Sequence, residues 1–283
     1  MPGRCLAAVI ESVPASDGAG VKLRRSLGSA DHLRHDPFLM LDEFFSDNPD
    51  DYLAGFPAHP HRGFETVTYM LDGRMRHEDS RGNRGALGPG DVQWMTAARG
   101  IIHSEMPQQT EGRMRGFQLW LNLPASHKMN PAAYRDIPAG EIPVAEPAQG
   151  VRVKVIAGTI EMGGTPVAGP APAGATEPLF LDLHLVPGTA FTVPLTAGHA
   201  AFLYLYEGSA RIGADGGALP HRAAGLLSDG EDVQVAAGPD GARLLVLAAR
   251  PIREPVVQYG PFVMNTRAEI EQAIRDYQQG RLG

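Results

Sequence analysis

The sequence predicts an all-β fold, with two β-barrel domains in one chain and a helix at the C-terminus. Glycine and proline are frequent, at 34 and 24 of 283 residues, and short apolar runs end repeatedly at turn signals. Two β-rich blocks share short similarities, which indicate an internal duplication. The hydrophobic share of 43% is sufficient for a sizeable core.

Strands in both blocks follow from their side-chain patterns. The run FETVTYML begins at Phe64 and stops at the turn signal Asp72-Gly73, and FQLWLNL forms a further strand from Phe117. In the second block, LFLDLHLV from Leu179 alternates leucine with other residues, so one face of that strand consists of leucine.

A helix is expected over residues 267–279, where apolar residues fall at helical spacing. Asn265 or Thr266 is suited to cap its first turn, and Gly280 is suited to end it.

We predict an N-terminal metal-binding domain over 1–135 and a C-terminal domain over 136–283. The second domain is expected to lack a metal site and to end in the helix, which packs back. The segments 138–150 and 163–178 are rich in Pro, Ala and Gly and are predicted to be linkers or loops.

Composition argues against several classes of protein. The net charge is −7 and no cluster of five or more Lys and Arg occurs, so direct nucleic-acid binding is not expected. Cys5 is the single cysteine, which excludes an intrachain disulfide and fits a reducing compartment. No apolar run approaches 18 residues and no convincing signal peptide is present, so we expect a cytoplasmic protein without membrane contact.

Two pairs of polar residues are the most informative feature of the chain. One residue separates His59 from His61, and one residue separates His103 from Glu105. On a β-strand, residues two apart point to the same face. If the two strands face one another across a barrel, four ligands converge on one point. Three imidazoles and a carboxylate suit a divalent first-row metal better than calcium or magnesium.

The internal similarity predicts which positions of the second block correspond to this site. Residues 69–73 are echoed by 204–208, Gly85-Ala86-Leu87 by Gly225-Leu226-Leu227, and Asp91-Val92-Gln93 by Asp232-Val233-Gln234. The positions corresponding to His59 and His61 would then lie near Pro194 and Thr196. Nothing near Leu244 to Val246 corresponds to His103 and Glu105, so the second copy would have the fold without the metal site.

These motifs resemble those of a known family. The pattern Gly…His-x-His…Glu…Gly, followed by Pro-Gly…Gly-x-x-His, resembles the two cupin motifs. The segments HPHRGFETVTYMLDGRMRHEDS, GDVQWMTAARGIIHSEMP and GPFVMNT resemble the pirin family, a bicupin group. The resemblance covers most of the chain and implies two jelly-roll-like cupin domains.

By this resemblance, the metal ligands are His59, His61, His103 and Glu105. In cupins generally the glutamate of the first motif is a ligand, and here that residue is Glu65. On a regular strand Glu65 would face the same way as His59 and His61, so it competes with Glu105 or orients a ligating imidazole. Four protein ligands leave one or two positions open, which suits Fe(II), with Mn, Ni, Cu or Zn as alternatives.

The resemblance implies two functions. Pirin-like proteins include flavonol 2,3-dioxygenases, which open the heterocycle of quercetin with O₂ and release CO. Here the metal would lower the pKa of the flavonol hydroxyl and Glu105 would accept its proton. The alternative is a regulatory metal-binding protein that binds a transcription factor or a metabolic enzyme without turnover.

Residues around the motifs have more ordinary expected roles. Trp94 and Trp120 are expected in the core or a cavity wall, and a wall around Trp94, Met95 and Phe64 would accept a planar aromatic ligand. His77, Glu78 and Asp79 follow the turn at Gly73 and are expected in a solvated loop.

Overall fold

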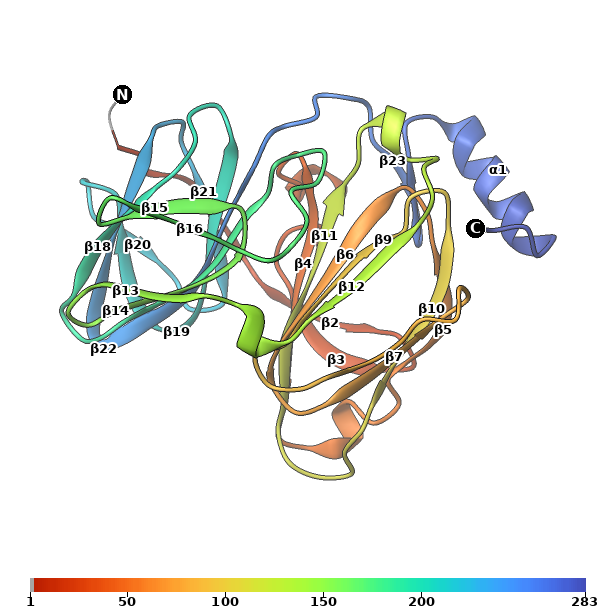
Figure 1. The fold of residues 1–283 in the computed structure, drawn as a ribbon, viewed down its shortest axis with the longest axis horizontal. Coiled ribbons are helices and arrows are strands. Elements are labelled where there is room, and N and C mark those ends of the chain that lie inside the picture. The colour runs from red at the N-terminus through yellow and green to blue at the C-terminus, as the bar shows by residue number, and fades with distance from the viewer. Residues whose placement is uncertain (1–2) are drawn as a thin grey trace. The chain divides into compact units, whose positions relative to one another are not determined.

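A computed structural model describes residues 3–283, and these residues group into two compact units, each built on antiparallel β-sheet (Figure 1). The first barrel comprises residues 13–28, 38–139 and 252–283. The second barrel comprises residues 3–12, 29–37 and 140–251. The division of the chain into domains over 1–135 and 136–283 stays a prediction. The units differ from that division at the chain ends, because the C-terminal segment groups with the first barrel.

The first barrel is built from two sheets. The larger has the order β12-β9-β6-β11-β4-β3-β2 and the smaller the order β5-β10-β7-β8. The larger sheet comprises β2 (Val13–Asp17), β3 (Val21–Arg25), β4 (Phe38–Ser46), β6 (Phe64–Asp72), β9 (Val92–Thr96), β11 (Met114–Asn122) and β12 (Ala133–Ile137). The smaller comprises β5 (Phe56–His61), β7 (Met75–Asp79), β8 (Arg84–Leu87) and β10 (Ile101–Pro107).

The second barrel has one nine-stranded sheet with the path β1-β21-β19-β22-β17-β14-β13, in which β18 and β20 are side branches. Its strands are β1 (Leu6–Glu11), β13 (Val144–Ala148), β14 (Val151–Ala157), β17 (Leu179–Leu185), β18 (Ala190–Pro194), β19 (Ala200–Ile212), β20 (Gly217–Leu219), β21 (Ala223–Leu227) and β22 (Asp232–Ala249). A separate hairpin joins β15 (Thr159–Met162) to β16 (Thr165–Ala168).

The two barrels have the same strand pairing. In the first, β6 pairs with β9 and β11, and β10 pairs with β5 and β7. In the second, β19 pairs with β21, and β22 pairs with both β18 and β19. The long β22 therefore corresponds to β10 followed by β11, and the long β19 to β6 followed by β7. This pairing supports the predicted duplication at the level of the backbone.

The pairing also corrects part of the predicted alignment. Because β8 and β20 occupy the same place, Gly85-Ala86-Leu87 corresponds to Gly217-Ala218-Leu219. The expected match with Gly225-Leu226-Leu227 was wrong, since those residues belong to β21, the counterpart of β9. The match of Asp91-Val92-Gln93 with Asp232-Val233-Gln234 was wrong as well, because Asp232 begins the part of β22 that corresponds to β10.

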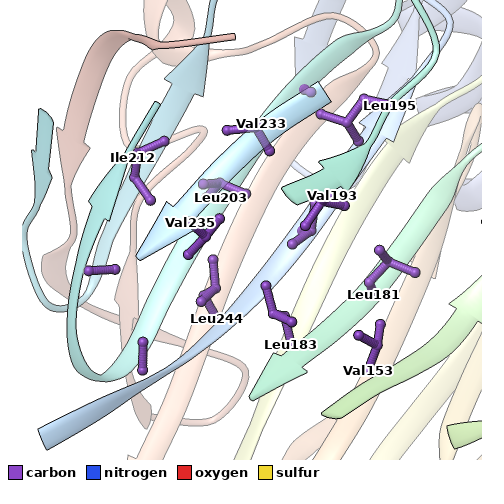
Figure 2. Packing of buried hydrophobic residues seen from close by; sticks show 14 of the residues in the cluster. Val153, Leu181, Leu183, Val193, Leu195, Leu203, Ile212, Val233, Val235 and Leu244 are labelled. Carbon is purple, nitrogen blue, oxygen red and sulfur yellow. The ribbon is translucent and has the colours of Figure 1, made fainter. Parts of the chain in front are cut away.

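The interior of the second barrel is aliphatic. Its core consists of valine, leucine, isoleucine and alanine side chains, with Met162 at the edge, from strands on both sides of the barrel. Figure 2 shows part of this cluster, in which side chains of β17, β18, β19 and β22 point toward one another. The leucine face predicted from Leu179 is part of it, because Leu181 and Leu183 are fully buried.

The C-terminal segment packs on the first barrel through a hairpin and a helix. The hairpin joins β23 (Val257–Tyr259) to β24 (Phe262–Met264), and α1 (Arg267–Gln278) follows. Thr266 and Glu269 form a capping box at the start of α1, which confirms the predicted N-cap. Ile270 is buried against Phe262. No helix among residues 3–283 is long and apolar enough to cross a membrane.

Gly63 lies where β5 gives way to β6 and contacts the C-terminal segment closely. Its φ is +95°, and a Cβ built there would lie 1.8 Å from the Val263 carbonyl oxygen. The buried Lys128 ammonium donates to both the Gly63 and the Val263 carbonyls, at 2.6 and 3.0 Å. This close approach fixes the end of the strand that carries His59 and His61.

We therefore expect Gly63→Ala to lower the free energy of unfolding by more than the ~1–2 kcal/mol that a positive φ alone costs an L-residue. Gly82→Ala is the matched control, because Gly82 has a φ of +86° but no atom within 4 Å of a built Cβ. Chemical denaturation of both variants measures the difference. Equal losses would show that the contact with Val263 is unimportant.

Candidate metal centre

Two neighbouring strands carry the paired polar residues. β5 and β10 are hydrogen-bonded in one sheet, with His103 directly opposite His59 and Ile101 opposite His61. The expectation that these strands face one another across the barrel was wrong. Convergence comes instead from cross-strand neighbours, whose side chains on one face lie about 5 Å apart at Cβ.

The three histidines form one compact group. Their ring centroids are 4.4 to 4.9 Å apart, and one candidate ligand nitrogen from each lies within 4.8 Å of the others. Nε2 of His59 and Nε2 of His61 are 3.0 Å apart. Two nitrogens that are each about 2.1 Å from one cation lie roughly 3 Å apart, so this spacing fits shared coordination.

The imidazoles are held in a state that suits a metal ligand. Nδ1 of His59 lies 2.8 Å from the Pro57 carbonyl oxygen, so it carries the proton and leaves Nε2 free to accept. Burial lowers the pKa of His61 and of His103 well below the usual range, and the neighbouring histidines lower it further. Both rings are therefore neutral at pH 7, the form that binds a metal.

A buried nitrogen atom without a protein partner supports the same assignment. Nε2 of His103 is inaccessible to solvent and has no hydrogen bond among residues 3–283. A buried polar atom left unpaired costs about 1–3 kcal/mol, so such atoms call for an explanation. The donor set of three imidazoles fits a first-row divalent cation.

Glu105 lies beside this group but outside it. Its side chain is buried, and its two oxygens accept hydrogen bonds from Oγ1 of Thr68 and Nε2 of Gln118, each at 2.9 Å. The mutually close ligand atoms come from the three histidines alone. Ligation by Glu105 therefore remains a prediction that rests on the family resemblance.

Glu65 is placed differently from the expectation. It was expected to share the face of His59 and His61 on one regular strand, but the chain turns at Gly63 and Glu65 belongs to β6 in the other sheet. Its carboxylate accepts a hydrogen bond from Oγ1 of Thr96 at 2.6 Å rather than from a ligating imidazole. Burial raises the pKa of Glu65.

A cavity of about 570 Å³ opens onto His59 and His61. Its apolar wall comes from Leu39, Met40, Phe56 and Trp120, and its polar lining includes Gln118, Gln258 and Arg25. The Trp120 ring packs on Phe64 with centroids 4.4 Å apart, and Nε1 of Trp120 donates to Oε1 of Gln118.

The predicted cavity wall of Trp94, Met95 and Phe64 was wrong in its residues. Trp94 and Met95 lie on β9 and are buried, and they do not line this cavity. Phe64 does not line the cavity but packs against Trp120. Trp120 was expected in the core or a cavity wall, and it lines the cavity. The sequence could not separate the tryptophans, because both alternate on apolar strands.

The loop expected at residues 77–79 is instead the end of strand β7, and His77 is buried with 1% of its surface exposed. A signal for this was present in the sequence. In MRHED, Met75, His77 and Asp79 alternate with two charged residues, which is the period-two pattern of a strand.

The second barrel has aliphatic residues at every position that corresponds to this site. In the first barrel Pro107 lies opposite Met75, and in the second barrel Ala237 lies opposite Ala210. Aligning these two pairs relates the residues of one barrel to those of the other. His59, His61, Thr68, His77, His103, Glu105 and Gln118 correspond to Val193, Leu195, Leu203, Ile212, Val233, Val235 and Val246, all in the aliphatic core (Figure 2).

The predicted counterparts Pro194 and Thr196 were one residue out of register, which places them on the opposite face of the strand. Leu244 to Val246, where no counterpart of His103 and Glu105 was expected, correspond to β11 rather than to β10.

Comparison with known proteins agrees with this architecture. The pirin family model matches residues 20–121, and the model of the pirin C-terminal cupin domain matches residues 180–283. The chain belongs to the pirin family. The predicted fold of two cupin domains with a C-terminal helix is thereby confirmed.

Similar proteins carry the name of one activity. A Pseudomonas aeruginosa protein named "Putative quercetin 2,3-dioxygenase" is 57% identical over 271 residues, which is 95% of this chain and 94% of that protein. The crystal structure of a quercetin 2,3-dioxygenase from Acinetobacter baumannii matches with a TM-score of 0.89 and 34% identity, and covers 99% of each chain.

A more distant bacterial pirin from Escherichia coli, whose structure was solved in complex with nickel(II), shares the fold. Its TM-score is 0.64 and its identity 17%, with 86% of this chain and 98% of that chain covered.

Replacement of His61 tests the metal centre. We expect His61→Ala to reduce bound cobalt(II) from about one equivalent per chain to background, because one of three converging donors is lost. Metal content is measured by plasma mass spectrometry after dialysis. His127→Ala is the control, since His127 is exposed and bonds to Ser126. Full cobalt content in His61→Ala would place any bound metal elsewhere.

Proposed function

We propose that this protein is a metal-dependent dioxygenase that cleaves flavonols such as quercetin with O₂ and releases CO. The observation that carries the proposal is the group of three imidazoles that opens onto a cavity with one aromatic wall. The similarity to proteins named as quercetin 2,3-dioxygenases supports the choice of substrate.

The three imidazoles of His59, His61 and His103 would hold the metal, and we assign Glu105 as the fourth ligand. Such a set leaves one or two coordination positions for substrate oxygen and O₂, as in catalytic rather than closed structural sites. When bound, the metal supplies Lewis acidity that lowers the pKa of a coordinated hydroxyl. We propose Fe(II), with Mn, Ni, Cu or Zn as alternatives.

Glu105 is also the group that we assign as base for the flavonol hydroxyl. Thr68 and Gln118 each donate a hydrogen bond to it, so its orientation is fixed from two sides. Both donors are neutral, so they orient the carboxylate without forming an ion pair with it. Gln118 also lines the cavity, and it therefore connects the carboxylate to the space where a substrate would lie.

The cavity suits a planar aromatic ligand. Its volume lies within the ~300–1,000 Å³ that small-molecule sites usually have. Trp120 offers an indole face held in place by Phe64 behind it and by the hydrogen bond to Gln118. Arg25, beside Asp17 and Asp42 at 3.0 and 2.7 Å, supplies a polar edge on the same cavity.

The test is O₂ consumption with quercetin by protein reconstituted anaerobically with Fe(II). We expect uptake with release of one CO per O₂ consumed, since both oxygen atoms enter the ring-opened product. Protein without metal, and the His61→Ala variant treated with Fe(II) in the same way, should show only the background rate.

Two results would contradict the proposal. Uptake that is equal with and without metal would exclude the metal centre from the reaction. No uptake by protein with a confirmed full equivalent of metal would exclude quercetin turnover, and would favour the alternative of a regulatory metal-binding protein.

A further inference from the structure

We propose that His77, supported by Asp79, is a positioning residue that fixes the ring orientation and tautomer of His103 for metal binding. This inference rests on the metal centre of the proposed function. It concerns a residue that neither the cupin motifs nor the histidine group includes, and it assigns that residue a role through another side chain rather than through the metal.

His77 is brought to His103 by the pairing of β7 with β10. Asp79 lies directly opposite His103 in the sheet, and His77 lies opposite Glu105. Because paired residues on neighbouring strands point to the same face, these side chains all turn toward the imidazole group. Nδ1 of His77 lies 3.4 Å from Nδ1 of His103, with ring centroids 5.1 Å apart.

The atoms of this contact admit one consistent arrangement of protons. Nε2 of His103 is buried without a partner, so it is the atom available to a cation. Nδ1 of His103 then carries the ring proton and donates it to Nδ1 of His77, which accepts. Nε2 of His77 in turn carries a proton; it is buried without a hydrogen-bond partner among residues 3–283, and the Asp79 carboxylate is 3.6 Å from it. A metal-bound imidazole that donates its second N–H in this way is fixed in one tautomer and gains basicity.

The surroundings hold His77 and Asp79 in place. The His77 ring stacks on Tyr134, with centroids 4.7 Å apart and planes 26° apart. The side chain of Asp79 is completely buried and accepts hydrogen bonds from the backbone N–H of Arg81 and from both the backbone and the side-chain amide of Asn83. The pair is therefore rigid, as a support for a ligand requires.

The second barrel gives independent evidence for the role. The position that corresponds to His77 there is Ile212, which belongs to the same aliphatic core as the counterparts of the three histidines (Figure 2). The same strand position thus accepts an aliphatic side chain when no histidines stand opposite. In the second barrel, therefore, the fold does not require a buried imidazole at this position.

The experiment measures cobalt(II) affinity of the full chain by competition with a chelator, together with the visible absorption spectrum of the bound cobalt. We expect His77→Leu to weaken cobalt binding about ten- to a hundredfold and to shift the absorption bands, the usual effect of losing an outer partner of a metal ligand. His77→Gln, whose amide oxygen can accept the same N–H, should recover part of the affinity. His127→Leu, at an exposed histidine, is the matched control.

The outcomes separate this role from the alternatives. If His77→Leu lowers thermal stability but leaves cobalt affinity and spectrum unchanged, His77 is structural and the inference is overturned. If His77→Leu does not fold, His77→Met removes both ring nitrogens with an unbranched side chain and is measured in the same way. If the wild-type chain binds cobalt no better than His61→Ala, the metal centre itself fails, and this role fails with it.

Discussion

The hydrogen-bonded pairing of β5 with β10 is the constraint on which the site depends. It places His59 opposite His103, and the two-residue period of a strand then adds His61 on the same face. One face of a four-stranded sheet thereby gathers three imidazoles, a carboxylate and a further histidine. A shift of this pairing by one residue would turn those side chains away from the barrel interior. The close contact of Gly63 with Val263 fixes the end of β5, so the C-terminal segment contributes to this register.

The two barrels show what the fold requires and what the site adds. With the same strand pairing, the second barrel fills the equivalent space with aliphatic side chains that pack into one core. Such packing stabilises a domain through burial of apolar surface. The first barrel lacks this packing at the seven polar positions of the site that were compared with the second barrel. It retains buried nitrogen atoms without hydrogen-bond partners among residues 3–283. The polar interior is therefore a local replacement of side chains within a common backbone. The free-energy cost of burying these unpaired polar atoms is consistent with stabilisation by a bound cation.

Much of this architecture followed from the sequence, because periodicity and turn residues act locally. The leucine face from Leu179, the capped C-terminal helix and the candidate metal-binding histidines could all be recognised from spacing. Long-range pairing could not. Spacing did not show that β5 and β10 are neighbours, or that Glu65 belongs to another sheet than His61. Thr68 and Gln118 escaped notice because a neutral polar residue in a strand has no signature until its partner, Glu105, is known.

The register of the repeat was misjudged for a related reason. Short similarities such as Asp-Val-Gln recur on strands that are not equivalent, and only the hydrogen-bonded ladder decides which residues correspond. Once that ladder is known, each polar residue of the site has a defined aliphatic counterpart. His77 stands out in this comparison, since it is replaced together with the three histidines although it lies outside their group.

The central claim is that one cation binds in the first barrel, at the three histidines. Anomalous diffraction from crystals of the cobalt-loaded protein, recorded at the cobalt absorption edge, tests it most directly. We expect one peak per chain, within bonding distance of nitrogens of His59, His61 and His103. A peak in the second barrel, or a first barrel without a peak in crystals shown to contain one cobalt per chain, would contradict it.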